Sequence, residues 1–339
     1  MPSKRITSFD VAKKSGVSRT TVSLVLNNVS GISIRDVTRQ RVIQVAKELD
    51  YHPDSRGRKL ASGRLNTIGL VLRQSHEQVV ADALLPQVLL GIEQAATAQG
   101  FQVLLKPLEP EDCDGYMHLI HENHVDGIIL SGPRLNEEEI IRLHQTGLSV
   151  MLMGQLPESG LPFVDIDAVD GSSRAVKHLI EHGHKRIAMI TNASLEYTSA
   201  QQRRSGYQKA LTETGIELDD SLIQEGAYTP ASGNIAMGKL LELTLRPTAV
   251  FVASDVVSLG AIRAIKQAGL RIPQDMAVVG FDDIPLADYY DPPLTTIRIP
   301  AFELGRSAGD RLMRLVLGES LDQEGVLLES ELVIRRSSF

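Results

Sequence analysis

From Thr67 onward, short runs of strand-forming residues alternate with longer helical stretches, and this alternation constrains the fold more than any other feature of the chain. Seven runs are rich in aliphatic residues: TIGLVL, FQVLL, DGIIL, SVMLM, RIAMIT, TAVFVAS and MAVVGFD. Between them lie stretches such as LLPQVLLGIEQAATAQG and LGAIRAIKQAG, several of which end in a glycine suited to a helix C-cap. Strands that alternate with helices form parallel sheets with helices on both faces.

The alternating region is too long for one sheet of this kind. It covers about 270 residues, whereas a single hydrophobic core stops growing near that size. We therefore expect two doubly wound α/β lobes.

The first 50 residues have a different pattern, that of short amphipathic helices. Thr7 and Asp10 are spaced as a capping box, and Gly16 gives the following turn a residue that tolerates positive φ. Ser18 can cap a second helix over 19–26. Two short helices joined by such a turn form either a DNA-binding helix-turn-helix or an ordinary helical hairpin.

A third helix is predicted over roughly 35–49, with either Ser33 or Asp36 as its cap. The stretch that follows, residues 51–64, contains proline, glycine and basic residues, a composition typical of a linker.

The charge of the chain is concentrated by sign. Residues 1–66 hold 13 Lys and Arg against 5 Asp and Glu, or +8, whereas the remainder carries −15 and the whole chain −7. A basic segment on an acidic protein is typical of a module that meets a polyanion. Near the start of the second helix, Arg19 can bind guanine and Thr20 can reach a base edge, which favours DNA.

Several classes of protein are made less plausible by what the sequence lacks. Cys113 is the single cysteine, no apolar run is long enough for a membrane span, and the N-terminus has no secretory signal, so we expect a cytoplasmic protein. No nucleophile–base set or cofactor motif is recognisable, so an enzyme and a bound cofactor are not expected. His118, His121 and His124 have helical spacing, and a solvated helix face explains them better than a metal site.

Several sequence motifs, spread in a consistent order along the whole chain, indicate a protein family. FDVAKKSGVSRTTVSLVLNN, AKELDYHPD, HLIEHGHKRIAMI, RRSGYQKAL and DPPLTTIRIP resemble the lactose/galactose repressor (LacI/GalR) family. The resemblance implies an N-terminal three-helix helix-turn-helix head and a periplasmic-binding-protein-like body of two doubly wound α/β lobes. The implied division is 1–50 head, 51–65 hinge, 66–163 with 299–325 first lobe, and 164–298 with 326–339 second lobe.

In this family a hinge helix forms on the operator, and a leucine from each subunit enters the minor groove. Leu60 occupies that position, and Gly57 stands where many members have alanine, which makes the hinge helix harder to form. Leu24 replaces a base-reading arginine of one member, so the operator sequence is not transferable. The expected DNA contacts are Thr7, Ser18, Arg19, Thr20, Thr21, Ser23, Asn27, Arg56, Gly57, Arg58 and Leu60.

The resemblance also places a small-molecule effector between the lobes. Arg203 and Asp282 would bind sugar hydroxyls, and Tyr228 would stack on the ligand; the alternative for Arg203 and Asp282 is a structural ion pair across the cleft. The expected effector contacts are Leu84, Tyr197, Ser199, Arg203, Tyr228, Ser254 and Asp282.

Three differences from sugar-responsive relatives lead us to expect a more apolar cleft with fewer hydroxyl acceptors. Leu84 and Leu85 replace an aromatic pair, Ser254 replaces an acidic or amide residue, and Gly154 replaces an aspartate. A glycoside with an apolar aglycone, a nucleoside-like ligand and a ligand-insensitive regulator all remain open.

The sequence therefore predicts a homodimeric transcriptional regulator that binds a pseudo-palindromic operator in double-stranded DNA and does not contact a membrane. A repressor whose operator affinity depends on a sugar or glycoside is the first hypothesis. A corepressor-dependent regulator, an activator and a solute-binding protein are the alternatives.

Overall fold

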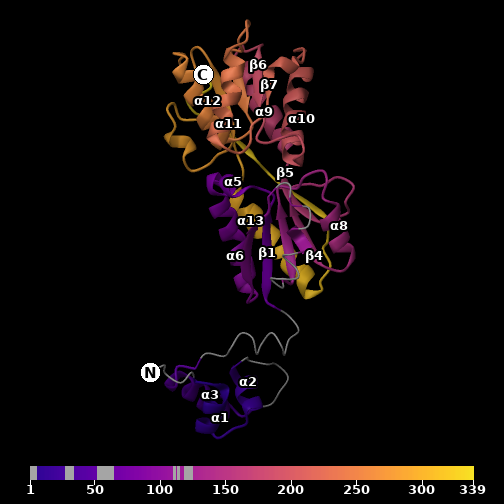
Figure 1. The fold of residues 1–339 in the computed structure, drawn as a ribbon, viewed down its shortest axis with the longest axis vertical. Coiled ribbons are helices and arrows are strands. Elements are labelled where there is room, and N and C mark those ends of the chain that lie inside the picture. Colours follow the sequence, from indigo (N-terminus) through magenta and orange to yellow (C-terminus); the bar gives the residue numbers. More distant parts are fainter. Residues whose placement is uncertain (1–5, 27–33, 52–64, 110–111, 113–114, 118–124) are drawn as a thin grey trace. The chain divides into compact units, whose positions relative to one another are not determined.

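The computed structural model describes residues 6–26, 34–51, 65–109, 112, 115–117 and 125–339. The chain divides into two compact units, residues 1–65 and 66–339, which we call the head and the body (Figure 1). Among the described residues, no helix combines the length and the apolar character needed to cross a membrane.

The head is built from three helices around a small core. They are α1 (Ser8–Ser15), α2 (Arg19–Leu26) and α3 (Asp36–Glu48). One apolar face of each helix is buried against the other two, as the sequence pattern predicts. The buried side chains are Val11, Ala12, Val22, Val25, Val42, Val45 and Ala46.

The ends of these helices follow local rules, with one correction. The Thr7 amide donates to Asp10 Oδ2 at 2.9 Å, and Gly16 ends α1 with a φ of 69°. Ser18 Oγ accepts the Thr21 amide at 3.0 Å and so caps α2. Asp36 does not cap α3, because it is already the first helical residue, and Ser33 lies outside the described residues.

The first sheet of the body has the order β11-β5-β4-β3-β1-β2, and all its neighbouring strands are parallel. Helices α6 (Leu85–Ala98) and α13 (Ala301–Leu317) share a core with one face, and α8 (Glu138–Gln145) with the other; α5 (His76–Ala81) follows β1. The strands are β1 (Thr67–Leu72), β2 (Gln102–Pro107), β3 (Gly127–Ser131), β4 (Ser149–Met153), β5 (Phe163–Ile166) and β11 (Gly325–Leu328).

The second sheet has the order β12-β10-β9-β8-β6-β7, with β12 antiparallel to β10. Helices α11 (Pro230–Leu241) and α12 (Asp255–Gln267) cover one face, and α9 (Ala168–Glu181) and α10 (Thr198–Glu213) cover the other. The strands are β6 (Ile187–Ile190), β7 (Ile223–Gln224), β8 (Ala249–Val252), β9 (Ala277–Asp282), β10 (Thr295–Arg298) and β12 (Glu331–Val333), and the short helices η1 (Asp220–Leu222) and η2 (Ala287–Tyr289) lie between strands.

Three chain crossings connect the two sheets, after β5, after β10 and after β11. The boundaries expected from the sequence are wrong by three residues at two of them. Residues 164–166 and 326–328 belong to the first sheet, because β5 pairs in parallel with β11 from Phe163–Gly325 to Ile166–Leu328.

Glycine permits the closest helix contact in the second lobe. A Cβ atom on Gly260 of α12 would lie 1.7 Å from the Pro230 carbonyl oxygen of α11. The two helix backbones therefore touch directly, which draws α11 and α12 together against the sheet.

Candidate functional site

A cavity of about 170 Å³ lies in the body where the carboxyl ends of strands from both sheets converge. Leu72, Ser131 and Met153 end strands of the first sheet and line one side, while Asp282 ends β9 of the second sheet and lines the other. Ligands in open α/β sheets bind at the carboxyl ends of the strands, so this cavity is the candidate effector site.

Arg203 of α10 and Asp282 lie at the wall formed by the second lobe. Their closest atoms, Arg203 Nη2 and Asp282 Oδ1, are 3.3 Å apart, and the guanidinium lies 4.0 Å from the centre of the Phe281 ring. The Arg203 side chain also donates to the Ala253 carbonyl oxygen, but its Nε is buried without a hydrogen-bond partner among the described residues. The ion pair forms within one lobe and does not cross the cleft.

The buried position of Asp282 changes its acidity. Burial raises its pKa to about 6, although Arg203 and the Ser254 hydroxyl both favour the ionised form. Burial and the nearby Asp282 also raise the pKa of Asp255, whose carboxylate accepts the Thr296 hydroxyl at 2.7 Å. The charge of Asp282 thus disfavours ionisation of the Asp255 carboxyl group beneath this wall.

A polar group built around Tyr228 completes the wall. Tyr228 has a φ of 57°, and its hydroxyl accepts the Asn192 amide at 3.0 Å and lies 3.3 Å from Ser199 Oγ. Asn192 Oδ1 is buried without a hydrogen-bond partner among the described residues. Tyr228 and Ser199 both line the cavity, and their contact with an effector remains a prediction.

Tyr197 is not among the residues that line the cavity. It is buried, and its hydroxyl donates to the Arg73 carbonyl oxygen at 2.6 Å, which joins the second lobe to the first. The Leu135 amide donates to the Glu196 carbonyl oxygen at 2.9 Å beside it. Tyr197 is therefore a contact between the lobes in this structure, and its expected contact with the effector remains a prediction.

The cavity contains two acceptors that the sequence analysis did not name. Asp82 and Asp165 line the cavity together with Asp282, and burial raises the pKa of both. Asp82 Oδ1 accepts the amides of Leu84 and Leu85 at 2.9 and 3.0 Å. The sequence carried a signal for Asp82, since an acidic residue shortly before a proline at a helix start is a typical cap. No pattern marked Asp165, because its orientation depends on the strand pairing of β5.

The remaining expected lining residues are also present at the cavity. Leu84, Ser254 and Gly154 line it, and Leu85 and Val88 extend the apolar side next to Leu84. The cavity thus has one aliphatic side on α6 and one polar side on the second lobe.

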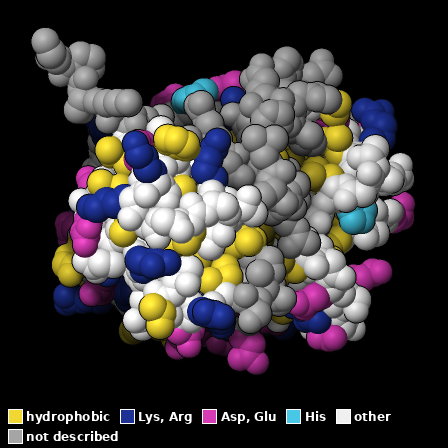
Figure 2. Space-filling model, turned by 90° about the horizontal axis from the view of Figure 1, so that it is seen from below, with side chains coloured by type: hydrophobic (Ala, Val, Ile, Leu, Met, Phe, Trp, Pro, Cys, Tyr) yellow, Lys and Arg dark blue, Asp and Glu magenta, His cyan; other side chains and the backbone are white. Residues whose placement is uncertain are grey.

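The structure describes some of the residues of the head that are expected to contact DNA. Arg19, Thr20 and Ser23 are exposed on α2, and Arg19 Nε donates to Ser8 Oγ at 3.3 Å. The space-filling view shows Lys and Arg side chains spread over the face seen from below (Figure 2). Thr7 and Ser18 occupy the caps described above, and Thr21 and Leu24 are half-buried. Asn27, Arg56, Gly57, Arg58 and Leu60 lie outside the described residues, as do Cys113, His118, His121 and His124.

Within the described ranges, no three His, Cys, Asp or Glu side chains are arranged so that they could hold a metal ion. Asp82, Asp165 and Asp282 therefore remain separate acceptors around the cavity.

Comparison with known proteins decides the family. Residues 9–54 match the bacterial regulatory proteins of the lacI family, and residues 176–338 match a periplasmic binding protein-like domain. The HTH-type transcriptional regulator CelR of Thermobifida fusca is 34% identical, over 96% of this chain and 96% of that protein. The chain belongs to the LacI family. Its members are transcriptional regulators, so this chain is a DNA-binding regulator with a helix-turn-helix head and a periplasmic-binding-protein-like body.

Solved structures of LacI-family proteins align with nearly the whole of this chain. A Lac repressor dimer bound to operator and the anti-inducer ONPF has a TM-score of 0.86 with 30% identity, over 99% of each chain. A complex of the regulator CelR with cellobiose has a TM-score of 0.76 with 32% identity, over 98% of this chain and all of that one.

Proposed function

We propose that this regulator is a cytoplasmic repressor that binds a pseudo-palindromic operator as a homodimer and changes its operator affinity when a small hydroxylated molecule occupies the cavity of the body. The observation that carries the proposal is a cavity between two lobes whose lining residues include buried polar atoms without a hydrogen-bond partner in the described part of the chain, Arg203 Nε and Gln74 Oε1. Such atoms are costly to bury unless a ligand or water satisfies them.

The chemistry of the cavity favours an uncharged ligand with many hydroxyl groups. Asp82, Asp165 and Asp282 supply acceptors, whereas Arg203 is the one basic side chain among the lining residues. A phosphate or carboxylate would meet three acidic groups at close range, which disfavours anionic ligands. The aliphatic side on α6 can cover the apolar face of a sugar ring or of a base.

The CelR–cellobiose complex gives a concrete first ligand. We infer that cellobiose or a related glycoside binds between the lobes, with Arg203 and Asp282 on its hydroxyl groups. Calorimetry with cellobiose, glucose, galactose, adenosine, cytidine and glucose 6-phosphate tests this. Binding of a neutral sugar or nucleoside that is weakened by R203A supports the proposal. Preferred binding of the phosphate contradicts it.

For the head, the proposal assigns base contacts to the exposed start of α2. Replacing Arg19 with alanine should cost about 1–3 kcal/mol on the operator and relax specificity at one base pair in each half-site. The measurement is fluorescence anisotropy with operator and with scrambled DNA. An equal loss on both DNAs would assign Arg19 to phosphate binding instead. Leu60 is proposed to enter the minor groove between the half-sites, and its basic neighbours Arg56 and Arg58 are proposed to contact phosphates.

The homodimer is supported by the dimeric Lac repressor complex, which aligns along the whole chain. Exposed apolar side chains on the body, such as Leu90 on α6, Leu259 on α12 and Tyr289, are available for a subunit contact. Sedimentation should give twice the chain mass of 37.0 kDa at micromolar concentration. The same anisotropy assay with ligand gives the sign of the effect, since a gain in operator affinity identifies a corepressor.

A further inference from the structure

The turn that follows β9 holds two consecutive residues in an unfavourable backbone conformation. Asp282 has a φ of 123° and Asp283 a φ of 53°. Residues other than glycine adopt such backbone angles where the surrounding structure holds them in place, and such residues cluster at functional sites. Because Asp282 lines the cavity, the contacts that hold this turn determine where its carboxylate lies.

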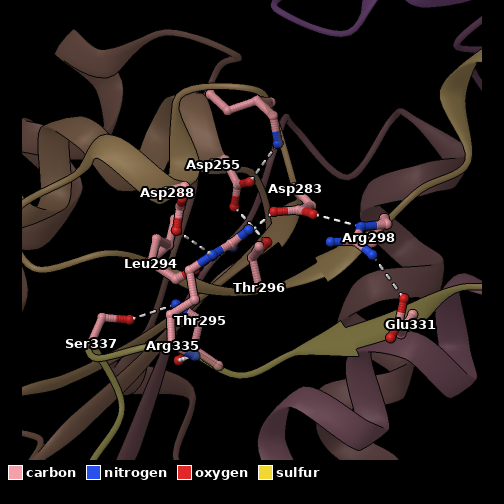
Figure 3. Close-up of polar contacts among 11 residues, drawn as sticks. Asp255, Asp283, Asp288, Leu294, Thr295, Thr296, Arg298, Glu331, Arg335 and Ser337 are labelled. Atoms are coloured by element: carbon pink, nitrogen blue, oxygen red, sulfur yellow. Dashed lines mark hydrogen bonds and ion pairs between the residues drawn. The ribbon is translucent and has the colours of Figure 1, made fainter.

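Asp283 is held by two arginines from other parts of the second lobe (Figure 3). Arg298 Nε contacts Asp283 Oδ2 at 2.7 Å, and Arg335 Nη1 contacts Asp283 Oδ1 at 2.8 Å. The side chains of Asp283 and Arg335 are only 7% and 15% exposed, so water screens their interaction weakly, whereas Arg298 is 48% exposed and its charge is screened more. Each carboxylate oxygen therefore has its own cationic partner.

The same two arginines extend the contacts to the chain crossings. Arg298 is the last residue of β10, directly before the chain crosses to the first lobe, and its Nη1 contacts Glu331 Oε2 at 2.9 Å. Glu331 is the first residue of β12, directly after the chain has crossed back. Arg335 also donates to the Leu294 carbonyl oxygen at 2.8 Å and contacts Asp288 at 3.2 Å.

A second support holds the turn from the side of α12. Asp255 Oδ2 accepts the Ile284 amide at 3.0 Å, and its Oδ1 accepts the Thr296 hydroxyl of β10 at 2.7 Å (Figure 3). Ile284 itself lines the cavity. The turn is thus fixed between α12 on one side and Arg298 with Arg335 on the other.

We infer that Asp283, held by Arg298 and Arg335, is the positioning residue for Asp282 and connects the effector cavity to two of the three chain crossings. This inference rests on the proposed effector role of Asp282. Asp283 has no place among the residues that line the cavity, so it acts through its neighbour. A ligand that binds Asp282 shifts the turn, and the shift reaches β10 and β12, which adjoin two of the chain crossings.

The first test is structural and needs no ligand. Asparagine tolerates positive φ nearly as well as aspartate does, so D283N removes the charge without adding backbone strain of its own. In crystals of the full chain, we expect the turn to relax and Arg203 Nη2 to lose its contact with Asp282. E331Q is the matched control, because it removes the exposed end of the network and should leave the turn as in the wild type. An unchanged turn in both D283N and R298Q would overturn the inference.

The second test is a double-mutant cycle with cellobiose as the probe, measured by calorimetry on the full chain. D283N should weaken binding at least roughly tenfold, as loss of a supporting residue does at other sites. In a D282N background, D283N should have no further effect, because the group that it positions is gone. Equal losses in both backgrounds would show a general structural role. If wild-type protein does not bind cellobiose, that result counts against the proposed ligand, and the crystal structures still decide the inference.

Discussion

In the absence of ligand, the buried Asp282 carboxylate should lower the free energy of unfolding of the body. Replacing Asp282 should therefore stabilise the body. Its pKa lies near 6 in the folded chain, against an ordinary value of 3.8. The folded state therefore binds a proton more tightly than the unfolded state. The stability contributed by this group is complete below pH 3.8 and is lost as the pH rises through 6.

The magnitude follows from the two pKa values. The raised pKa of Asp282 costs the folded state about 3 kcal/mol at pH 7.5 and roughly half of that at pH 5. Asparagine has no charge to bury and accepts the positive φ of 123° at this position as readily as aspartate. D282N should thus raise the free energy of unfolding by about 3 kcal/mol at pH 7.5 and by about half of that at pH 5.

Urea unfolding of the body, followed by circular dichroism at fixed protein concentration, measures both values. D275N is the control. Asp275 is an exposed partner of Arg271, and its pKa is lowered to about 2 in the folded state. Its ionised form therefore stabilises the fold, so D275N should lower the free energy of unfolding at pH 7.5, whereas D282N should raise it. A destabilising D282N, or a gain that is the same at pH 5 and pH 7.5, would refute the reasoning. A stabilised protein that has lost its effector response would show that this carboxylate is retained for binding.

Three further predictions address the head, the core and the contact between lobes. Operator affinity should fall with salt with a log–log slope of several units, and a protein that begins at Asn66 should show no binding in the same titration. G260A should lower the free energy of unfolding by about 3 kcal/mol in urea, because the new methyl group would overlap the Pro230 carbonyl oxygen. Y197F removes the hydrogen bond to the Arg73 carbonyl oxygen, so hydrogen exchange at the Leu135 amide should accelerate about fivefold; an unchanged rate would show that this contact does not hold the lobes together.

Much of the fold could be predicted from the hydrophobic periodicity of the sequence and from its helix-capping residues. The seven aliphatic runs all form strands, α1 ends at Gly16 and α2 begins after Ser18 as predicted, whereas the cap predicted at Asp36 for α3 was wrong. The elements without a separate prediction are short or amphipathic. Strands β5, β7 and β12 have two to four residues, too few to show a period, and α11 has a glycine, Gly233, on the side that packs on α12.

The site was predictable only in part, for a physical reason. Arg203, Tyr228 and Asp282 came from the family pattern, and the cavity brings them together. Asp82 was missed although its position before the start of α6 is typical of a cap, and Asp165 was missed because no local pattern reports which side chains of a strand face a second lobe. The contact of Tyr197 with the Arg73 carbonyl oxygen was not predicted, since it depends on how the two lobes meet.

The route of the chain through the body has a consequence for its synthesis. The first lobe is complete only when α13 and β11 are in place, because Ala308, Leu312 and Met313 fill the core beneath β1 and β4. Those side chains leave the ribosome only after all strands of the second sheet except β12. The head contains only local contacts and can fold first, whereas the first lobe must wait with an exposed apolar face. Newly made chains therefore pass through a state in which the DNA-binding unit is ready before the unit that governs it.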